Sequence, residues 1–242
     1  MSSDVKVRNN KILFLLFAFI AFMGSFFYGI ANSTAHVAIV IILFFSLGAA
    51  TVSLLFRGKK PEFRGYFYTF CICVFFGGLA QSYSNLAFDN LQSTYDAANF
   101  FYPNIDLIPP FQKPEKQLFS MEYALPIVIW QQLYVFFWNV GIDSGPYIGV
   151  ILNSVTMAIA ASITVNTARL VYGNDIVKLN RVAILFSLCG IFILFGTILL
   201  RDCFITLLNI IVLWGTIKWL KAPKAFNTII LLFVLVVCSI FM

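Results

Sequence analysis

Two adjacent charged residues, Arg201 and Asp202, stand between two long apolar runs of this sequence. An ionisable side chain at the end of a membrane span is costly unless it reaches the headgroups, pairs with another charge or lines a wet cavity. The pair is therefore a candidate for function. The alternative interpretation is a hairpin turn whose charges only mark the membrane interface.

A second set of acids lies in residues 82–122, a segment that holds five acidic residues and two lysines. Asp89 and Asp96 lie on either side of Tyr95 within it. A connecting segment of this length is uncommon unless it has a function, although a single acid in such a loop is more often simply solvated. Asp89 and Asp96 are therefore candidate site residues, with simple solvation as the alternative.

The elements that must position these residues are membrane spans. The chain has 242 residues, of which 61% are apolar, 17% aromatic and 11% charged, and this is too little polar surface for a water-soluble globule. The first apolar run is too long for a signal peptide and is interpreted as a retained anchor. The expected spans are residues 12–31, 35–56, 66–81, 146–168, 182–200 and 203–220, with a possible seventh at 225–242.

The net charge of +6 comes from short basic clusters between the apolar runs, which indicates membrane orientation and not a nucleic-acid partner. The five cysteines lie in or at the ends of apolar segments, and they show no zinc-binding spacing. We therefore expect buried free thiols and no metal or other cofactor. A divalent metal shared by Asp96 and Asp202 remains a minor alternative without any further ligand motif.

Orientation depends on residues 123–140, which are apolar enough to be mistaken for another span. If this segment crosses the membrane, the 16 lysines and arginines divide equally between the two sides. If it stays at the outer interface, the basic clusters at 6–11, 57–64, 169–181 and 218–224 share the cytoplasmic side and hold 13 of the 16. The count therefore favours an interfacial or re-entrant helix, a cytoplasmic N-terminus and an outward-facing Arg201–Asp202 pair. The alternative is an ordinary span that disregards the charge preference.

The composition of residues 123–140 agrees with an interfacial helix. Tyrosine and tryptophan favour the headgroup level, and a proline with two glutamines would burden a lipid-facing span. The residues concerned are Tyr123, Trp130, Tyr134, Trp138, Pro126, Gln131 and Gln132. The expected fold is therefore all-α: a single polytopic transmembrane helical bundle over residues 1–242, whose outer loop 82–145 carries the interfacial helix 123–140.

Four patterns follow one another in a fixed order over residues 85–220. An acidic loop with tyrosines precedes the aromatic segment YALPIVIWQQLYVFFWNVGIDSG, and then come GVILNSVTMAIAASITVNTARLVYG, which contains Asn153, and TILLRDCFITLLNIIVLW. Their order and sidedness resemble the polyprenyl-phosphate-dependent glycosyltransferases of the C superfamily and related membrane polysaccharide enzymes. Two features depart from that family: two extra spans precede the acidic loop, and the chain stops within or just after an apolar run. We therefore expect a truncated, degenerate or short relative.

The resemblance implies an enzyme of a bacterial inner (plasma) membrane that moves a sugar from a polyprenyl-phosphate donor to a glycan or lipid acceptor of the cell envelope. Asp96 or Asp89 would then be the base, Arg201 would bind the phosphate, and Asp202 would orient Arg201 or the acceptor. The alternatives are a polysaccharide polymerase and a non-catalytic accessory or transport protein of the membrane.

Overall fold

The computed structural model describes residues 3–32, 36–88, 124–142 and 145–223, together with 228–229, 231–233 and 235–236. All regular secondary structure within these residues is helical, and the described part of the chain contains no strand. The expectation of an all-α chain is confirmed to that extent. The described helices are α1 (Ser3–Asn32), α2 (His36–Phe56), α3 (Lys60–Phe88), α5 (Ala124–Asn139), α6 (Tyr147–Tyr172), α7 (Ile176–Ser187), α8 (Gly190–Thr197) and α9 (Asp202–Lys221).

Five of these helices are long and apolar enough to cross a membrane: α1 from Lys11 onward, α2, α3, α6 and α9. This is the pattern of a multi-pass membrane protein. The possible last span, 225–242, falls largely outside the described residues.

The segment expected as one span at 182–200 belongs to two helices, α7 and α8, which meet at a bend of 57°. Cys189 is extended between them, with ψ at 114°, and Gly190 begins the second helix. The side-chain oxygen of Asp175 caps α7 by accepting the amide N–H groups of Lys178 and Val177, and these bonds lower the pKa of the Asp175 carboxyl. Hydropathy cannot reveal such a break, because both sides of the bend are apolar.

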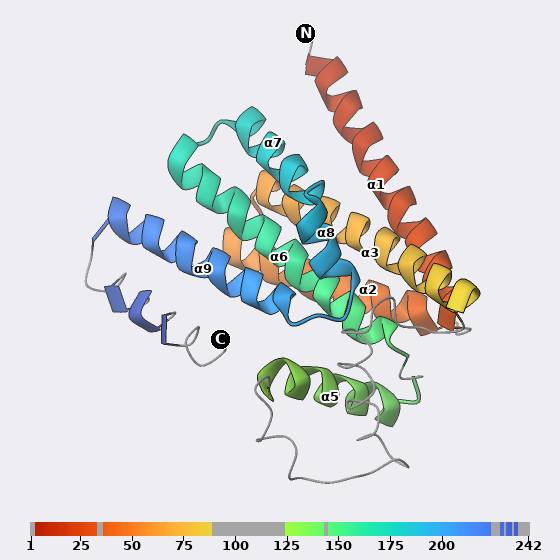
Figure 1. Ribbon diagram of the computed structural model, residues 1–242. Coiled ribbons are helices and arrows are strands. Elements are labelled where there is room, and N and C mark those ends of the chain that lie inside the picture. The colour runs from red at the N-terminus through yellow and green to blue at the C-terminus, as the bar shows by residue number, and fades with distance from the viewer. Residues whose placement is uncertain are drawn as a thin grey trace.

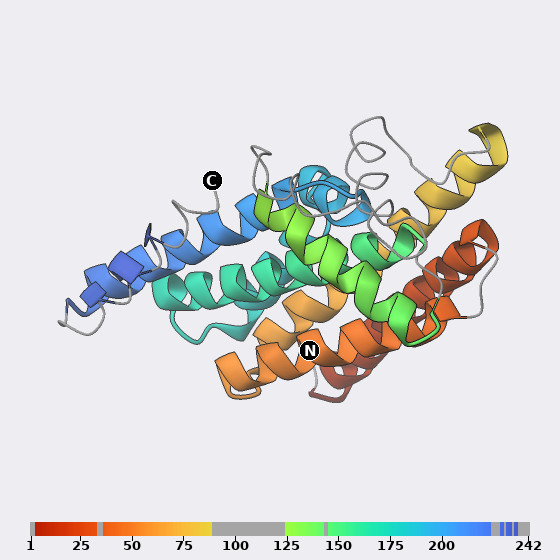
Figure 2. The same cartoon turned by 90° about the horizontal axis from the view of Figure 1, so that it is seen from below.

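Helix α6 is the centre of the bundle. It packs against α2, α3, α5, α7, α8 and α9, while α1 packs on the far side of α3 (Figures 1 and 2). Small residues on α6 allow this close approach, since they let neighbouring backbones come together. Those that are fully buried are Ser154, Ala158, Ala160, Ala161 and Ser162.

Helix α5 lies across the bundle and not alongside the long helices (Figures 1 and 2). Its 16 residues correspond to about 24 Å, which is short for a span. Trp130 and Tyr134 are fully buried in the protein, so their side chains pack inside the bundle, and the depth of α5 in the membrane stays a prediction. The ring of Trp130 packs edge-on against the ring of Phe204, with 5.9 Å between the ring centroids. These two aromatic residues therefore attach α5 to the bundle itself. Tyr123 is outside the described residues, and Trp138 remains 40% exposed.

Three of the four basic clusters meet at one end of the bundle. Arg57 and Lys59 in the turn between α2 and α3 line the same pocket as Lys218 near the end of α9, and Arg169 of α6 contacts the first turn of α3. The count of lysines and arginines predicts that these clusters lie together if residues 123–140 do not cross the membrane. Which side of the membrane this end faces stays a prediction.

That orientation is tested by labelling Asn174→Cys, between α6 and α7, in a chain without other cysteines. We expect no reaction with an impermeant maleimide in intact cells and full reaction after permeabilisation, because residues 169–181 are expected to be cytoplasmic. Val140→Cys, at the end of α5, is the outward-facing control and is expected to react in intact cells. If Asn174→Cys reacts from outside, residues 123–140 cross the membrane and the proposed sidedness fails.

Candidate functional site

The structure describes two of the four residues predicted to form the catalytic site. Asp89 and Asp96 lie outside the described residues, so their distance from Arg201 stays untested. Arg201 and Asp202 lie at the start of α9, and both are partly exposed. This is where the apolar run of α8 ends and the next helix begins.

Two polar side chains of α6 hold the connection that leads into Arg201. The Asn153 amide donates to the carbonyl oxygens of Ile198 at 2.8 Å and Leu200 at 3.1 Å, and the Ser154 hydroxyl donates to Gly196 at 2.7 Å. Carbonyls at the end of a helix lack intrahelical partners and must be satisfied by other groups. Asn153 and Ser154 are fully buried, so these bonds fix the position of the α8–α9 connection within the bundle.

The start of α9 also has local reasons to form where it does. The carbonyl of Arg201 accepts the amide of Phe204 at 2.9 Å, and Asp202 places a negative charge in the first turn, where the helix dipole favours one. Phe204 packs against Trp130, which brings α5 beside this turn. Arg201 and Asp202 therefore lie where the start of α9 meets α5 and the connection that α6 holds in place.

A second polar cluster lies at the opposite, basic end of the bundle. The Arg169 guanidinium binds both carboxylate oxygens of Glu62, with Nε donating to Oε1 and Nη2 to Oε2, each at 2.7 Å. The Glu62 side chain is 0% exposed and that of Arg169 is 14% exposed. A two-pronged, charge-assisted contact of this kind is the strongest way to satisfy a buried carboxylate.

Asn166 extends this ion pair to a third helix. Its amide nitrogen donates to Glu62 Oε1 at 2.9 Å, and its amide oxygen accepts the indole N–H of Trp214 at 3.0 Å. The Ser162 hydroxyl donates to the backbone carbonyl of Glu62 at 2.9 Å. The resulting network links the first turn of α3, the last turns of α6 and the middle of α9.

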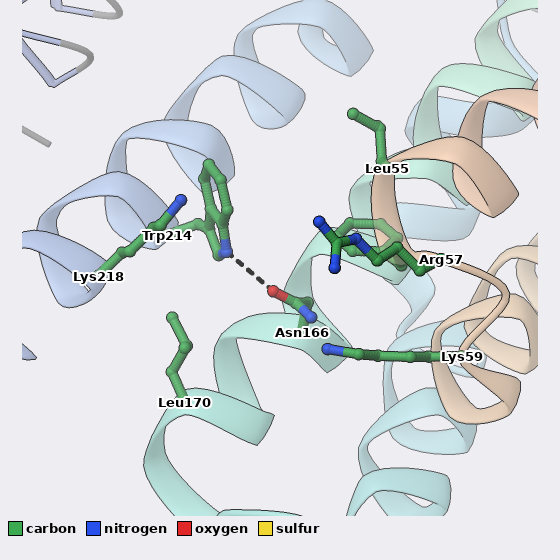
Figure 3. A pocket seen from close by; sticks show the side chains of 8 residues that line it. Leu55, Arg57, Lys59, Asn166, Leu170, Trp214 and Lys218 are labelled. Atoms are coloured by element: carbon green, nitrogen blue, oxygen red, sulfur yellow. Dashed lines mark hydrogen bonds between the residues drawn. The ribbon is translucent and has the colours of Figure 1, made fainter. Parts of the chain in front are cut away.

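A pocket of about 310 Å³ lies beside this network. Figure 3 shows Arg57 and Lys59 reaching toward Asn166 from the α2–α3 turn, while Trp214 and Lys218 approach from α9. Leu55, Phe56 and Leu170 complete the lining. The pocket thus combines three cations with an apolar rim.

Sequence reasoning missed this end of the molecule as a site, because its basic residues were interpreted only as markers of orientation. Two features of the sequence could have indicated the polar cluster at this end. Glu62 is the one acid within the otherwise basic segment 57–64, and Asn166 and Arg169 are three residues apart, which places them on one face of a helix.

The prediction of buried free thiols is confirmed for three of the four described cysteines and not for Cys189. Cys71, Cys73 and Cys203 are free and buried, and Cys189 is free and partly exposed. Cys238 lies outside the described residues. The three buried thiols make the native protein its own reporter of unfolding, since a thiol-reactive dye reaches them only when the bundle opens.

No protein-family model, characterised protein or solved structure was found to match this chain. Its function is therefore argued from its own residues.

The hydrogen bonds of Asn153 are tested by Asn153→Leu. Leucine keeps the branched shape and the number of heavy atoms but removes one donor from each of two carbonyl oxygens. Ile198 keeps the amide of Leu200 and Leu200 keeps the thiol of Cys203, so the cost is that of two lost hydrogen bonds, about 0.5–1.5 kcal/mol each. We expect the free energy of unfolding in mixed detergent micelles to fall by at least about 1 kcal/mol, as reported by dye labelling of the buried thiols in a Cys189→Ser, Cys238→Ser background.

The matched control is Thr156→Val on the same helix. Its hydroxyl donates only to the carbonyl of Leu152, one turn earlier. We expect this change to stay within about 0.5 kcal/mol. If both variants have equal stability, Asn153 does not hold the α8–α9 connection.

Proposed function

We propose that this chain is a membrane glycosyltransferase, which moves a sugar from a polyprenyl-phosphate donor to a glycan or lipid acceptor of the cell envelope at the outer face of the membrane. The observation that carries the proposal is Arg201, presented by a connection that Asn153 and Ser154 hold in place. It lies at the end of the bundle opposite to the basic clusters, about 30 Å away along α9.

The surroundings of Arg201 suit a lipid-linked phosphate. Helix α9 follows directly and is apolar, and only 11% of its apolar stretch is buried within the protein. A prenyl chain can therefore lie along α9 with its phosphate at Arg201. A guanidinium suits this role because it offers two parallel donors to phosphate oxygens and keeps its charge at any physiological pH.

The transfer step has a simple balance of atoms. A carboxylate of the outer loop, Asp96 or Asp89, accepts the proton of the acceptor hydroxyl as that oxygen attacks the anomeric carbon of the donor sugar. The bond between that carbon and the phosphate oxygen breaks, and polyprenyl phosphate leaves with the electron pair. Arg201 stabilises the departing phosphate, and Asp202 orients Arg201 or the acceptor. A polysaccharide polymerase would use the same chemistry with a growing chain as its acceptor.

One observation favours a different class, a transport or accessory protein. The bent pair α7 and α8 has a glycine at its break, and transporters build their sites from broken helices of this kind. Such proteins carry the break twice, at matching places in two halves, whereas the described residues contain one bent pair. The enzyme therefore remains our first proposal.

The enzyme proposal is tested with purified protein and a radiolabelled polyprenyl-phosphate sugar. We expect Arg201→Lys to lower the transfer rate at least about tenfold, because an ammonium cannot reproduce the two-pronged phosphate contact. Asp96→Asn is expected to lower it about 100-fold or more, since it keeps the shape but removes the proton acceptor. Asp89→Asn is the rival substitution at the second candidate base.

Arg181→Lys, in α7 and remote from the start of α9, is the matched control and is expected to leave the rate unchanged. Normal transfer by Arg201→Lys and by both aspartate variants would show that the site is wrong. If the wild-type chain neither binds nor transfers from the donor, the transport or accessory function replaces the enzyme.

A further inference from the structure

The pocket at the basic end gathers positive charge from separate parts of the chain. Arg57 and Lys59 belong to the turn between α2 and α3, and Lys218 belongs to the last turn of α9. All eight lining residues are neutral or cationic, with no acid among them. Like charges repel one another, so such a group is most stable when an anion lies between its members.

The nearby acids are already engaged. Both carboxylate oxygens of Glu62 are bound by Arg169, and Oε1 also accepts from Asn166. Asp175 caps α7 and pairs with Lys178 at 3.6 Å. Among the side chains that the structure describes at this end, the two carboxylates are therefore committed to other partners. The Lys218 ammonium lies over the Trp214 ring, 4.8 Å from its centroid, and no described carboxylate pairs with Arg57, Lys59 or Lys218.

The backbone at Arg57 supports a role for its side chain. Arg57 has a φ of 51°, in the left-handed region that favours glycine, and Gly58 follows at 67°. The amide of Gly58 closes the end of α2 by donating to the carbonyl of Ser53 at 3.0 Å. A glycine at position 57 would form this turn with less strain. Strained positions of this kind are concentrated at functional sites.

The apolar rim shows what kind of anion fits. Leu55 is 60% exposed at the end of α2, and Leu170 and Trp214 are partly exposed on α6 and α9. Helix ends, tryptophan and exposed leucine next to cations together mark the depth at which lipid headgroups meet acyl chains. A lipid offers both chemistries at once, a phosphate for the cations and a chain for the leucines.

We infer that the pocket lined by Arg57, Lys59, Asn166, Trp214 and Lys218 binds the phosphate headgroup of an anionic membrane lipid, with an acyl chain lying along Leu55 and Leu170. At about 310 Å³ the pocket is at the lower end of the range of small-molecule sites. This site is separate from Arg201 and does not depend on the proposed glycosyl transfer.

The experiment uses the full chain in dodecylmaltoside micelles, with the buried thiols as reporters of the unfolding midpoint. Phosphatidylglycerol, phosphatidylcholine and inorganic phosphate are titrated separately at constant ionic strength. We expect phosphatidylglycerol to raise the midpoint, because a ligand that binds only the folded state stabilises it. Phosphatidylcholine is expected to have no such effect, and inorganic phosphate is expected to need at least about a tenfold higher concentration, because it lacks the chain.

Substitutions locate the site. Each juxtamembrane cation contributes roughly fivefold to the binding of an anionic lipid, so Arg57→Gly with Lys218→Ala should raise the apparent Kd for phosphatidylglycerol at least about tenfold. Arg57→Gly alone should raise the midpoint of the lipid-free protein while weakening lipid binding, since it removes both the backbone strain and the charge. Lys221→Ala is the control: it removes a charge from the same last turn of α9 but lies outside the pocket.

Loss of the lipid effect in the pocket variants and its retention in Lys221→Ala would support the site. An equal loss in Lys221→Ala would show a diffuse basic surface and overturn it. A response to phosphatidylcholine equal to that of phosphatidylglycerol would also overturn it, and equal potency of inorganic phosphate would overturn the assignment to a lipid.

Discussion

The ion pair between Glu62 and Arg169 is the interaction on which the arrangement of the basic end depends. A carboxylate with 0% exposure is tolerated only when its charge and its lone pairs are satisfied, and Arg169 with Asn166 does both. Because the three residues lie on α3 and α6, and Asn166 also accepts from Trp214, the pair fixes three helices at once. Because Arg169 binds both carboxylate oxygens of Glu62, this acid does not neutralise the cations of the pocket.

Helix α6 carries the two polar groups that organise opposite ends of the bundle. Asn166 takes part in the ion-pair network, and Asn153 holds the α8–α9 connection about 20 Å away along the same helix. The small residues between them keep the neighbouring helices close. The positions of Arg201 at one end and of the basic pocket at the other are thus set by a single rigid element. Neither charged group needs a soluble domain to hold it.

Hydropathy and charge counting were sufficient for the coarse architecture. The long apolar runs correspond to helices such as α2 and α6, and the grouping of basic residues at one end followed from the positive-inside preference. The bend at Cys189 was not predictable, because it lies between two apolar segments. The burial of Trp130 was missed because tryptophan suits a headgroup interface and a packed core equally well. The pairing of Glu62 with Arg169 joins residues 107 positions apart, and such a long-range contact leaves little trace in one sequence.

A double-mutant cycle with Glu62→Gln and Arg169→Met, measured by unfolding in mixed micelles, tests the central role of the ion pair most directly. Arg169→Met leaves the Glu62 carboxylate buried without its cation and is expected to cost about 3–5 kcal/mol. Once Glu62 is neutral the same change should cost much less, so the double variant should be more stable than the sum of the single changes by at least about 2 kcal/mol. Additivity to within about 0.5 kcal/mol would show that the two residues are not coupled, and it would contradict this account of the basic end.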